Sequence, residues 1–155
     1  MEQKRFISKI SRVAQGYTMK ALKGFDLNLS ELHAVRTITW FPGLSQTELS
    51  ERLSIDKAAV ARTINRLEDK GYIERREDEK DKRINRLYPL EKAASVKDES
   101  ISVENDFYDW LFEILEEGER AKFLSTLEML TARAREERRL GFPNALKKAG
   151  KGTNE

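Results

Sequence analysis

Helix start and stop signals are concentrated in residues 45–93, and they constrain the fold more than any other feature of the sequence. Ser45, followed three residues later by Glu48, forms a capping-box pattern that predicts the start of a short helix. Asp56 is suited to cap a second helix, and Gly71 stands where the end of that helix favours a left-handed residue. The stretch therefore predicts two short helices joined by a tight turn.

A charged hairpin is predicted to follow these helices. Tyr72-Ile73 restart the chain as a strand, residues 77–82 form a polar tip, and residues 83–88 return with alternating side chains. Two helices and such a hairpin are typical of a winged helix-turn-helix, in which the second helix and the hairpin tip can each enter one groove of duplex DNA. The order of elements indicates a mainly α-helical fold with a small β-hairpin wing, and sequence-specific binding of double-stranded DNA.

The apolar spacing of the second helix determines which of its residues DNA would meet. Val60, Ile64 and Leu67 recur at helical spacing and are expected to face inward. The opposite face then carries Ala58, Arg62, Asn65 and Asp69. Because Arg can form two hydrogen bonds with a guanine edge and Asn with an adenine edge, we expect Arg62 and Asn65 to contact bases. The alternative is a solvated helix face.

Other residues of this region are expected to approach DNA without reading its sequence. Ala58 and Ala61 are small, so the helix backbone can come close to the major groove. Phosphate contacts, which position a protein on the duplex, are expected from Ser45, Lys57 and Arg66. Residues 45–93 hold 12 Lys and Arg against 11 Asp and Glu, so placement matters more than bulk charge.

Amphipathic helices are predicted before this region. Residues 4–23 place apolar side chains at intervals of three and four, which is one stripe of a helix. A further helix is expected to begin with Ser30 as its cap. Its buried side would consist of Leu32, Val35 and Ile38.

The chain after Pro89 is predicted to be helical over most of residues 91–139, with a break at Glu117-Gly118. The apolar side chains of this part recur at helical spacing and exceed what one small lobe requires. The tail, residues 143–155, has few apolar side chains and is expected to be disordered.

Composition excludes several classes of function. The chain has 155 residues, no cysteine and one histidine, and it lacks a phosphate-binding glycine loop. Disulfides, thiolate metal sites, Cys-His nucleophilic pairs and His-rich zinc sites are therefore excluded, and we expect no enzyme activity, no cofactor and no metal. No secretory signal or apolar run of membrane-spanning length is present, which predicts a soluble cytoplasmic protein with no membrane partner.

These elements together resemble the MarR (multiple-antibiotic-resistance regulator) family of bacterial transcription factors. The resemblance covers nearly the whole chain, and Asp81-Lys82-Arg83 matches the Asp-x-Arg signature of the family wing. Residues 60–66 and 71–75 resemble the recognition helix and the strand after it. Pro89-Leu90 departs from the Leu-Thr that usually precedes the next helix, and losing the Thr cap is expected to cost about 1 kcal/mol.

The resemblance implies that different parts of the chain bind DNA and form the dimer. Residues 30–92 would form the winged helix-turn-helix DNA-binding domain. Residues 1–25 and 95–142, from both termini, would form a helical dimerisation lobe, so that a homodimer addresses the two halves of a pseudopalindrome.

The resemblance also indicates two kinds of site. Arg83 is expected to enter the minor groove, held by Asp81, with Lys82 adding charge; the alternative is an exposed ion pair. His33, Arg36 and Trp40 share a helix face that borders a cleft in the family, and Tyr17 is a further candidate. Such clefts bind small aromatic or amphipathic effectors in relatives.

The leading hypothesis is a homodimeric repressor that an effector releases from its operator. A winged-helix module that binds a protein, without specific DNA binding, is the alternative. Alanine at Arg62, Asn65 and Arg83 would distinguish the two, because it should abolish duplex binding and leave the dimer intact.

Overall fold

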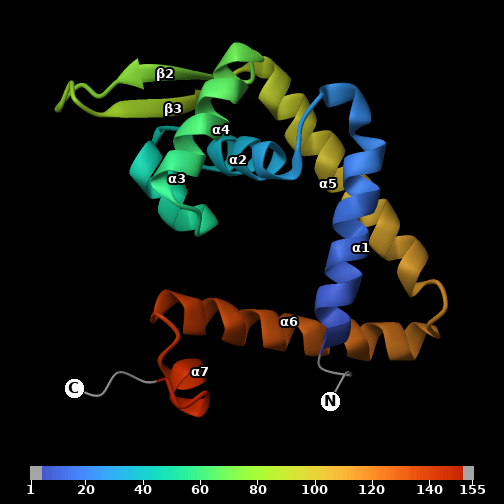
Figure 1. Cartoon of the computed structure of the whole chain (residues 1–155). Helices are drawn as coiled ribbons and strands as arrows, with labels where there is room; N and C mark the ends of the chain where they lie inside the picture. Colours follow the sequence, from blue (N-terminus) through green and yellow to red (C-terminus); the bar gives the residue numbers. More distant parts are fainter. Residues whose placement is uncertain (1–4, 152–155) are drawn as a thin grey trace. The chain divides into compact units, whose positions relative to one another are not determined.

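The computed structural model describes residues 5–151 of the chain (Figure 1). Helices predominate among these residues, and a small sheet accompanies them. In chain order the elements are α1 (Phe6–Ala21), the 3-10 helix η2 (Lys23–Phe25), α2 (Leu29–Trp40), β1 (Leu44–Ser45), α3 (Gln46–Leu53), α4 (Lys57–Asp69), β2 (Ile73–Glu77), β3 (Asn85–Pro89), α5 (Glu91–Phe112), α6 (Glu117–Arg139) and α7 (Pro143–Lys148).

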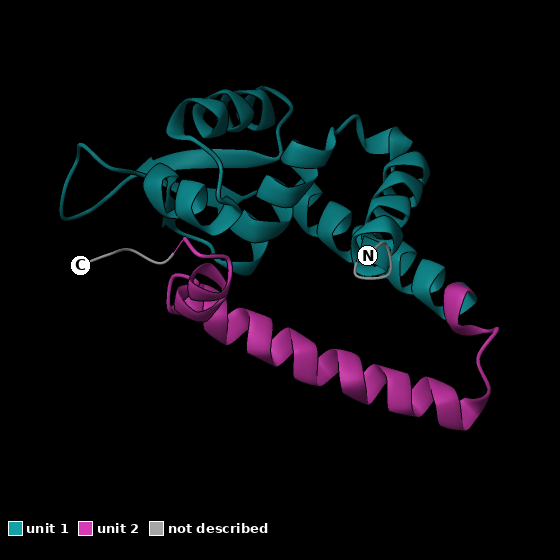
Figure 2. Cartoon of the chain, turned by 60° about the horizontal axis from the view of Figure 1, so that its bottom comes forward, with its two compact units in different colours: residues 1–110 teal, residues 111–155 magenta. Residues whose placement is uncertain are grey.

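The chain divides into two compact units, Met1–Trp110 and Leu111–Glu155 (Figure 2). The first unit contains the winged helix-turn-helix together with α1 and most of α5, whereas the second contains α6 and α7. The expected division into a DNA-binding domain and a dimerisation lobe depends on a second copy of the chain, and it stays a prediction. Among residues 5–151, no helix is both long and apolar enough to span a bilayer.

The core of the first unit lies under the two short helices and the sheet. Val60, Ile64 and Leu67 are at most 2% exposed, which confirms the inward face predicted for α4. The predicted inner residues of α2 are buried as well, as are residues of α3, of both hairpin strands and of α5. The largest members of this cluster are Leu32, Ile38, Leu49, Ile64, Leu67, Tyr72, Ile73 and Leu87.

The sheet is antiparallel, with strand order β1-β3-β2. Ile73 pairs with Pro89 and Glu77 with Asn85, so the hairpin extends beyond α3 and α4 (Figure 1). The return strand begins at Asn85, two residues later than predicted. β1 was not predicted, because a strand of two residues has no alternation of its own and depends on pairing with Leu87.

Caps at the starts of the helices account for two agreements and one correction. Ser45 and Glu48 form the predicted capping box of α3. Asp56 caps α4 as predicted, and its carboxylate accepts a hydrogen bond from the Ala59 amide. Ser30 does not cap α2; Asn28 does, and it forms a capping box with Glu31. The physical reason is that Asn28 lies one residue before the helix in extended backbone, where its side chain reaches the free amides.

Two expectations for the C-terminal part are wrong. The break between the long helices falls at residues 113–116, and Glu117-Gly118 lie in the first turn of α6, where Glu116 and Glu119 form a capping box. Pro143–Lys148, expected to be disordered, form α7. Proline suits the first turn of a helix, and the Glu137 carboxylate accepts hydrogen bonds from the Asn144 side chain and the Ala145 amide.

The position without the usual Thr cap still starts a helix. α5 begins at Glu91, directly after Leu90. The Leu90 amide donates to the Tyr72 carbonyl oxygen at 2.9 Å, so a tertiary contact holds the chain at this point. The acidic side chain of Glu91 also lies in the first turn, where negative charge is favourable.

Candidate nucleic-acid interface

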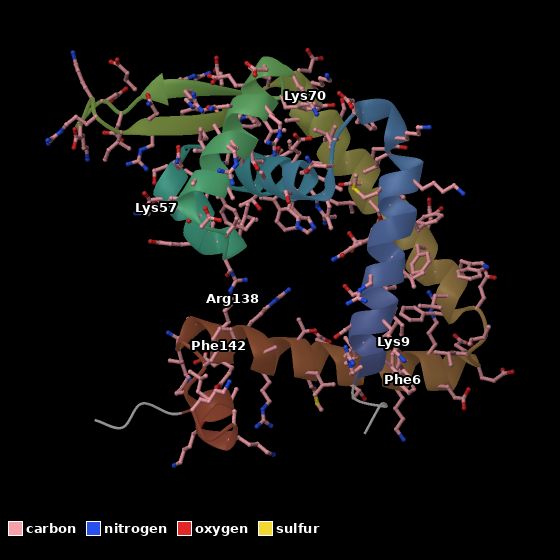
Figure 3. All side chains as sticks on the ribbon, in the orientation of Figure 1. Phe6, Lys9, Lys57, Lys70, Arg138 and Phe142 are labelled. Atoms are coloured by element: carbon pink, nitrogen blue, oxygen red, sulfur yellow. The ribbon has the colours of Figure 1, made fainter. Side chains whose placement is uncertain are left out.

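The outer face of α4 is exposed as the periodicity predicts. Ala58, Arg62, Asn65 and Asp69 are accessible, while the opposite side of the helix is in the core. Lys57 begins the helix and is also exposed (Figure 3). The geometry is that of a helix able to enter a major groove, and contact of these residues with DNA stays a prediction.

Asn65 has a protein partner that the sequence analysis did not foresee. Its side-chain oxygen accepts a hydrogen bond from Arg75 of β2, and Arg75 also forms an ion pair with Glu68 at 2.9 Å. An amide that reads adenine uses both its oxygen and its nitrogen. Because that oxygen has two lone pairs, Arg75 occupies one and the other remains for a base, but the bond restricts how the Asn65 amide can turn.

Arg66, expected to bind phosphate, lies in a network around a buried carboxylate. Its Nε donates to Glu31 Oε1 at 2.7 Å, and Lys70 Nζ lies 3.0 Å from Glu31 Oε2. Glu31 is only 1% exposed, whereas the Arg66 side chain remains 45% exposed. The network joins the start of α2 to the recognition helix.

The charge state of Glu31 follows from these contacts. Burial raises the pKa of its carboxyl, but hydrogen bonds from Asn28, Arg66 and Lys70 together hold this pKa below the usual value. Glu31 is therefore ionised in the folded protein at neutral pH. Its burial could not be predicted from the sequence, because an acidic residue in a first turn normally faces solvent.

Ser45 is half-buried and already used by the capping box. Its hydroxyl oxygen accepts from the Glu48 amide at 3.2 Å, and its own amide donates to the Glu48 carboxylate at 2.7 Å. The hydroxyl can still donate a hydrogen to a phosphate oxygen. Lys57 provides a positive charge at the other helix start of the motif.

The wing tip presents the expected pair. Asp81 Oδ1 accepts hydrogen bonds from both the Arg83 amide at 3.0 Å and Arg83 Nε at 3.1 Å. The Arg83 side chain is nevertheless 91% exposed, and Lys82 next to it is exposed too. The tip therefore carries an oriented guanidinium that remains accessible to a partner.

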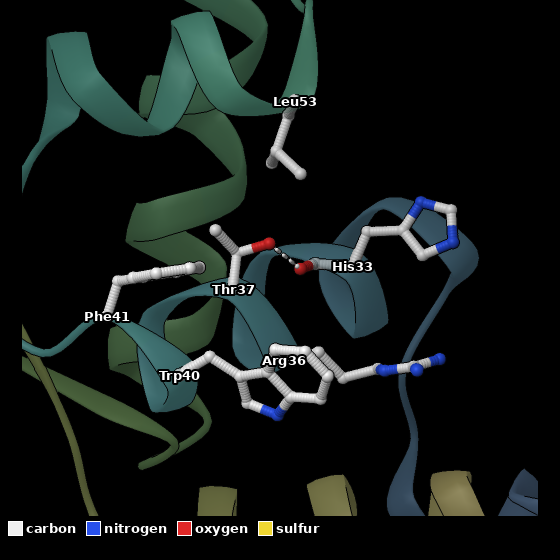
Figure 4. Close-up of a pocket in the computed structure, with 6 residues that line it drawn as sticks. All are labelled: His33, Arg36, Thr37, Trp40, Phe41 and Leu53. Carbon is white, nitrogen blue, oxygen red and sulfur yellow. Dashed lines mark hydrogen bonds between the residues drawn. The ribbon is translucent and has the colours of Figure 1, made fainter. Parts of the chain in front are cut away.

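Three of the four residues predicted to bind an effector line a cleft of about 210 Å³ (Figure 4). It is lined by His33, Arg36, Thr37, Trp40, Phe41 and Leu53. Arg36 Nη1 pairs with Glu104 of α5 at 3.0 Å. Burial, and secondarily the neighbouring Arg36 charge, lower the pKa of His33 and favour its neutral form.

Tyr17 is not part of this cleft. Its ring packs against Phe107 with the centroids 5.3 Å apart, in a separate groove between α1 and α5 that Val13 and Trp110 also line. The separation arises because Tyr17 lies on the α1 face that meets α5. Among residues 5–151, no group of three or more His, Cys, Asp or Glu residues could hold a metal ion.

Comparisons with known proteins agree with this architecture. The MarR family profile matches residues 27–84. YybA of Bacillus subtilis, an HTH-type transcriptional regulator, is 33% identical over 92 residues, which are 59% of this chain and 61% of YybA. BilQ of Clostridium symbiosum, another such regulator, is 32% identical over 67% of this chain and 72% of its own length. The chain thus spans less than two thirds of YybA and more than two thirds of BilQ.

Solved structures show the same fold over most of the chain. A crystal structure of MarR is 28% identical, with a TM-score of 0.77, and the match covers 89% of this chain and 94% of that one. Streptococcus pneumoniae FabT in complex with DNA shares the fold at 20% identity and a TM-score of 0.69, over 88% of this chain and 99% of FabT. The relatives are regulators and not enzymes, and the chain belongs to the MarR family of winged-helix transcriptional regulators.

Proposed function

We propose that the chain is a homodimeric repressor that binds a pseudopalindromic operator and leaves it when a small molecule binds. One observation carries the DNA-binding part. Arg62 on the outer face of α4 and Arg83 at the wing tip are both exposed in the same compact unit. Arg62 is suited to a guanine edge in the major groove, and Arg83 to the negative potential of a narrow minor groove.

Exposed apolar side chains on α1 and α5 support the dimer. Ile7 is 63% exposed, Val13 61% and Trp110 63%. Val13 and Trp110 line the α1–α5 groove, which has a volume of about 670 Å³. Contiguous apolar surface of this kind marks an interaction site, and a two-fold dimer would cover it with the same surface of a second copy. Residues 1–25 and 95–142 remain the proposed dimerisation region.

The cleft at α2 supports the effector part of the proposal. Aromatic Trp40 and Phe41 offer apolar contacts, and Arg36 offers a cation at one side. A small aromatic acid suits this lining, because its carboxylate would compete with Glu104 for Arg36. Release from DNA requires that such an effector binds two conformations of the dimer with different affinity.

Selection of bound duplexes from a random pool tests the proposal. We expect an inverted repeat whose half-sites lie about one helical turn apart. Binding should weaken steeply with salt, because neutralised phosphates release counterions. Alanine at Arg62, Asn65 and Arg83 together should abolish duplex binding and leave the oligomeric state unchanged. Affinity that is unmeasurable, or indifferent to salt, would favour a protein-binding winged-helix module.

A further inference from the structure

Arg86 of β3 connects the wing to the rest of the winged domain. Its Nε donates to Asp78 Oδ2 at 2.6 Å, and its Nη1 lies 3.1 Å from Glu48 Oε2 and 3.3 Å from the Gly43 carbonyl oxygen. The Arg86 side chain is 31% exposed. One guanidinium thus joins the hairpin tip, the first turn of α3 and the turn before β1.

Asp78 links Arg86 to the backbone of the wing tip. While Oδ2 holds Arg86, Oδ1 accepts the backbone amides of Lys80 at 2.8 Å and Asp81 at 3.0 Å. The hydrogen bond from Arg86, followed by those from the two amides, lowers the pKa of Asp78 to about 2. The carboxylate is therefore charged at every pH at which the protein would act, and its bonds to the tip persist.

The tip in turn orients the wing arginine. The Asp81 amide is held by Asp78, and the Asp81 side chain holds both the amide and Nε of Arg83. Two backbone bonds close the same loop, from Asp78 to the Ile84 carbonyl and from Ile84 to the Asp81 carbonyl, each 2.9 Å. A continuous path of hydrogen bonds therefore runs from Glu48 of α3 through Arg86, Asp78 and Asp81 to Arg83.

We propose that Arg86 is a positioning residue for DNA binding. By ordering the wing tip through Asp78, Arg86 sets the direction of Arg83 relative to α4. The inference rests on the proposed function, in which Arg83 enters the minor groove. Its energetic basis is preorganisation: a tip that is already ordered loses less conformational freedom on binding. The charge of Arg86 is balanced by Asp78 and Glu48, so its effect on DNA runs through geometry more than through attraction to phosphate.

The experiment is a double-mutant cycle between Arg86 and Arg83 on the selected operator. Arg86→Gln in the full-length chain should weaken binding roughly 5- to 30-fold, a factor that corresponds to the ordering of about one residue. In an Arg83→Ala background the same substitution should have little effect, because the side chain it positions is absent. Arg86→Lys should resemble Arg86→Gln, because lysine keeps the charge and loses the fork that spans Asp78 and Glu48.

Arg76→Gln is the matched control. Arg76 lies on the same hairpin and pairs with Glu74, outside the path to Arg83, so its loss changes the charge equally. This variant should weaken binding much less than Arg86→Gln. An Arg86→Gln penalty of the same size with and without Arg83 would indicate a general structural role and overturn the proposal, as would full affinity of Arg86→Lys.

Backbone order parameters of the free protein separate this inference from the function on which it rests. In Arg86→Gln and in Asp78→Asn, the order parameters of the Lys80 and Asp81 amides should fall from the rigid value of about 0.85 to about 0.6 or below. Unchanged order parameters in a folded variant would refute the inference. Lower order parameters together with full DNA affinity of Arg83→Ala would confirm the ordering of the tip and refute the minor-groove role of Arg83.

Discussion

Arg75 of β2 donates a hydrogen bond to the side-chain oxygen of Asn65, on the face of α4 that DNA would meet. The same guanidinium pairs with Glu68 one helical turn further along. The residue proposed to read adenine is therefore partly engaged before DNA arrives. Its contribution to recognition depends on whether the bond to Arg75 allows the amide to take the orientation that a base requires.

This restraint on the Asn65 amide gives a prediction. Asn65→Ala should weaken operator binding by about 1–3 kcal/mol and relax the preference at one base pair. The penalty should be larger in an Arg75→Met background, because the amide can then turn freely toward the base. Affinities of the four proteins for the operator and for a variant at that base pair measure the coupling. Equal Asn65→Ala penalties in both backgrounds would show that Arg75 does not restrain the Asn65 amide.

Arg62 and Lys57 are expected to act differently. Arg62→Ala should cost about 1–3 kcal/mol and abolish discrimination at one guanine, because a bidentate base contact is lost. Lys57→Ala should weaken all duplexes about equally and reduce the salt slope by about 1, as expected for a phosphate contact. Titrations at several salt concentrations distinguish them. A uniform effect of Arg62→Ala across sequences would contradict a base contact.

The Glu31 network predicts an effect on stability. Glu31→Ala should lower the free energy of unfolding by about 3 kcal/mol, the low end for breaking a buried ion pair, because Arg66 and Lys70 keep partial access to water. Glu74→Ala is the matched control: its pair with Arg76 is exposed and should contribute about 0–1 kcal/mol. Urea unfolding measures both, and equal effects would argue against a structural role for Glu31.

The same carboxyl predicts a pH dependence. Its pKa in the folded protein is below the ordinary value of 4.5, so the unfolded chain binds a proton more readily. The stability that Glu31 contributes is therefore complete above about pH 4.5 and is lost as the pH falls through the folded pKa. The stability difference between the wild type and Glu31→Gln should shrink with acid below that pH. A difference that stays constant from pH 7 to about pH 3 would contradict the lowered pKa.

The exposed groove on α1 and α5 predicts the effect of a buried charge. Val13→Glu should convert the proposed dimer to a monomer or raise its dissociation constant strongly, because an unpaired carboxylate would be buried at the contact. Arg12→Glu, also exposed on α1 but outside the groove lining, is the control. Sedimentation equilibrium gives the association state. An unchanged state for Val13→Glu would place the interface elsewhere.

The helices of the DNA-binding motif were predictable because their signals are local. Ser45 with Glu48 and Asp56 lie within one turn of the amides they cap, and Val60, Ile64 and Leu67 share a face by helical periodicity alone. The exposure of Arg62 and the Asp81–Arg83 contact follow from the same short-range geometry. The cap of α2 and the break before α6 were misplaced, since several nearby polar residues offered competing signals.

Only the tertiary structure decided which partners the site residues have. Glu31 and Arg66 are 35 positions apart, and Glu48 and Arg86 are 38 apart. Nothing in the spacing of residues states that such pairs will meet, because their contact depends on how α2, α4 and the hairpin pack. Local propensity therefore determines which face of α4 is exposed, whereas packing determines which partners Glu31, Arg66 and Arg86 have.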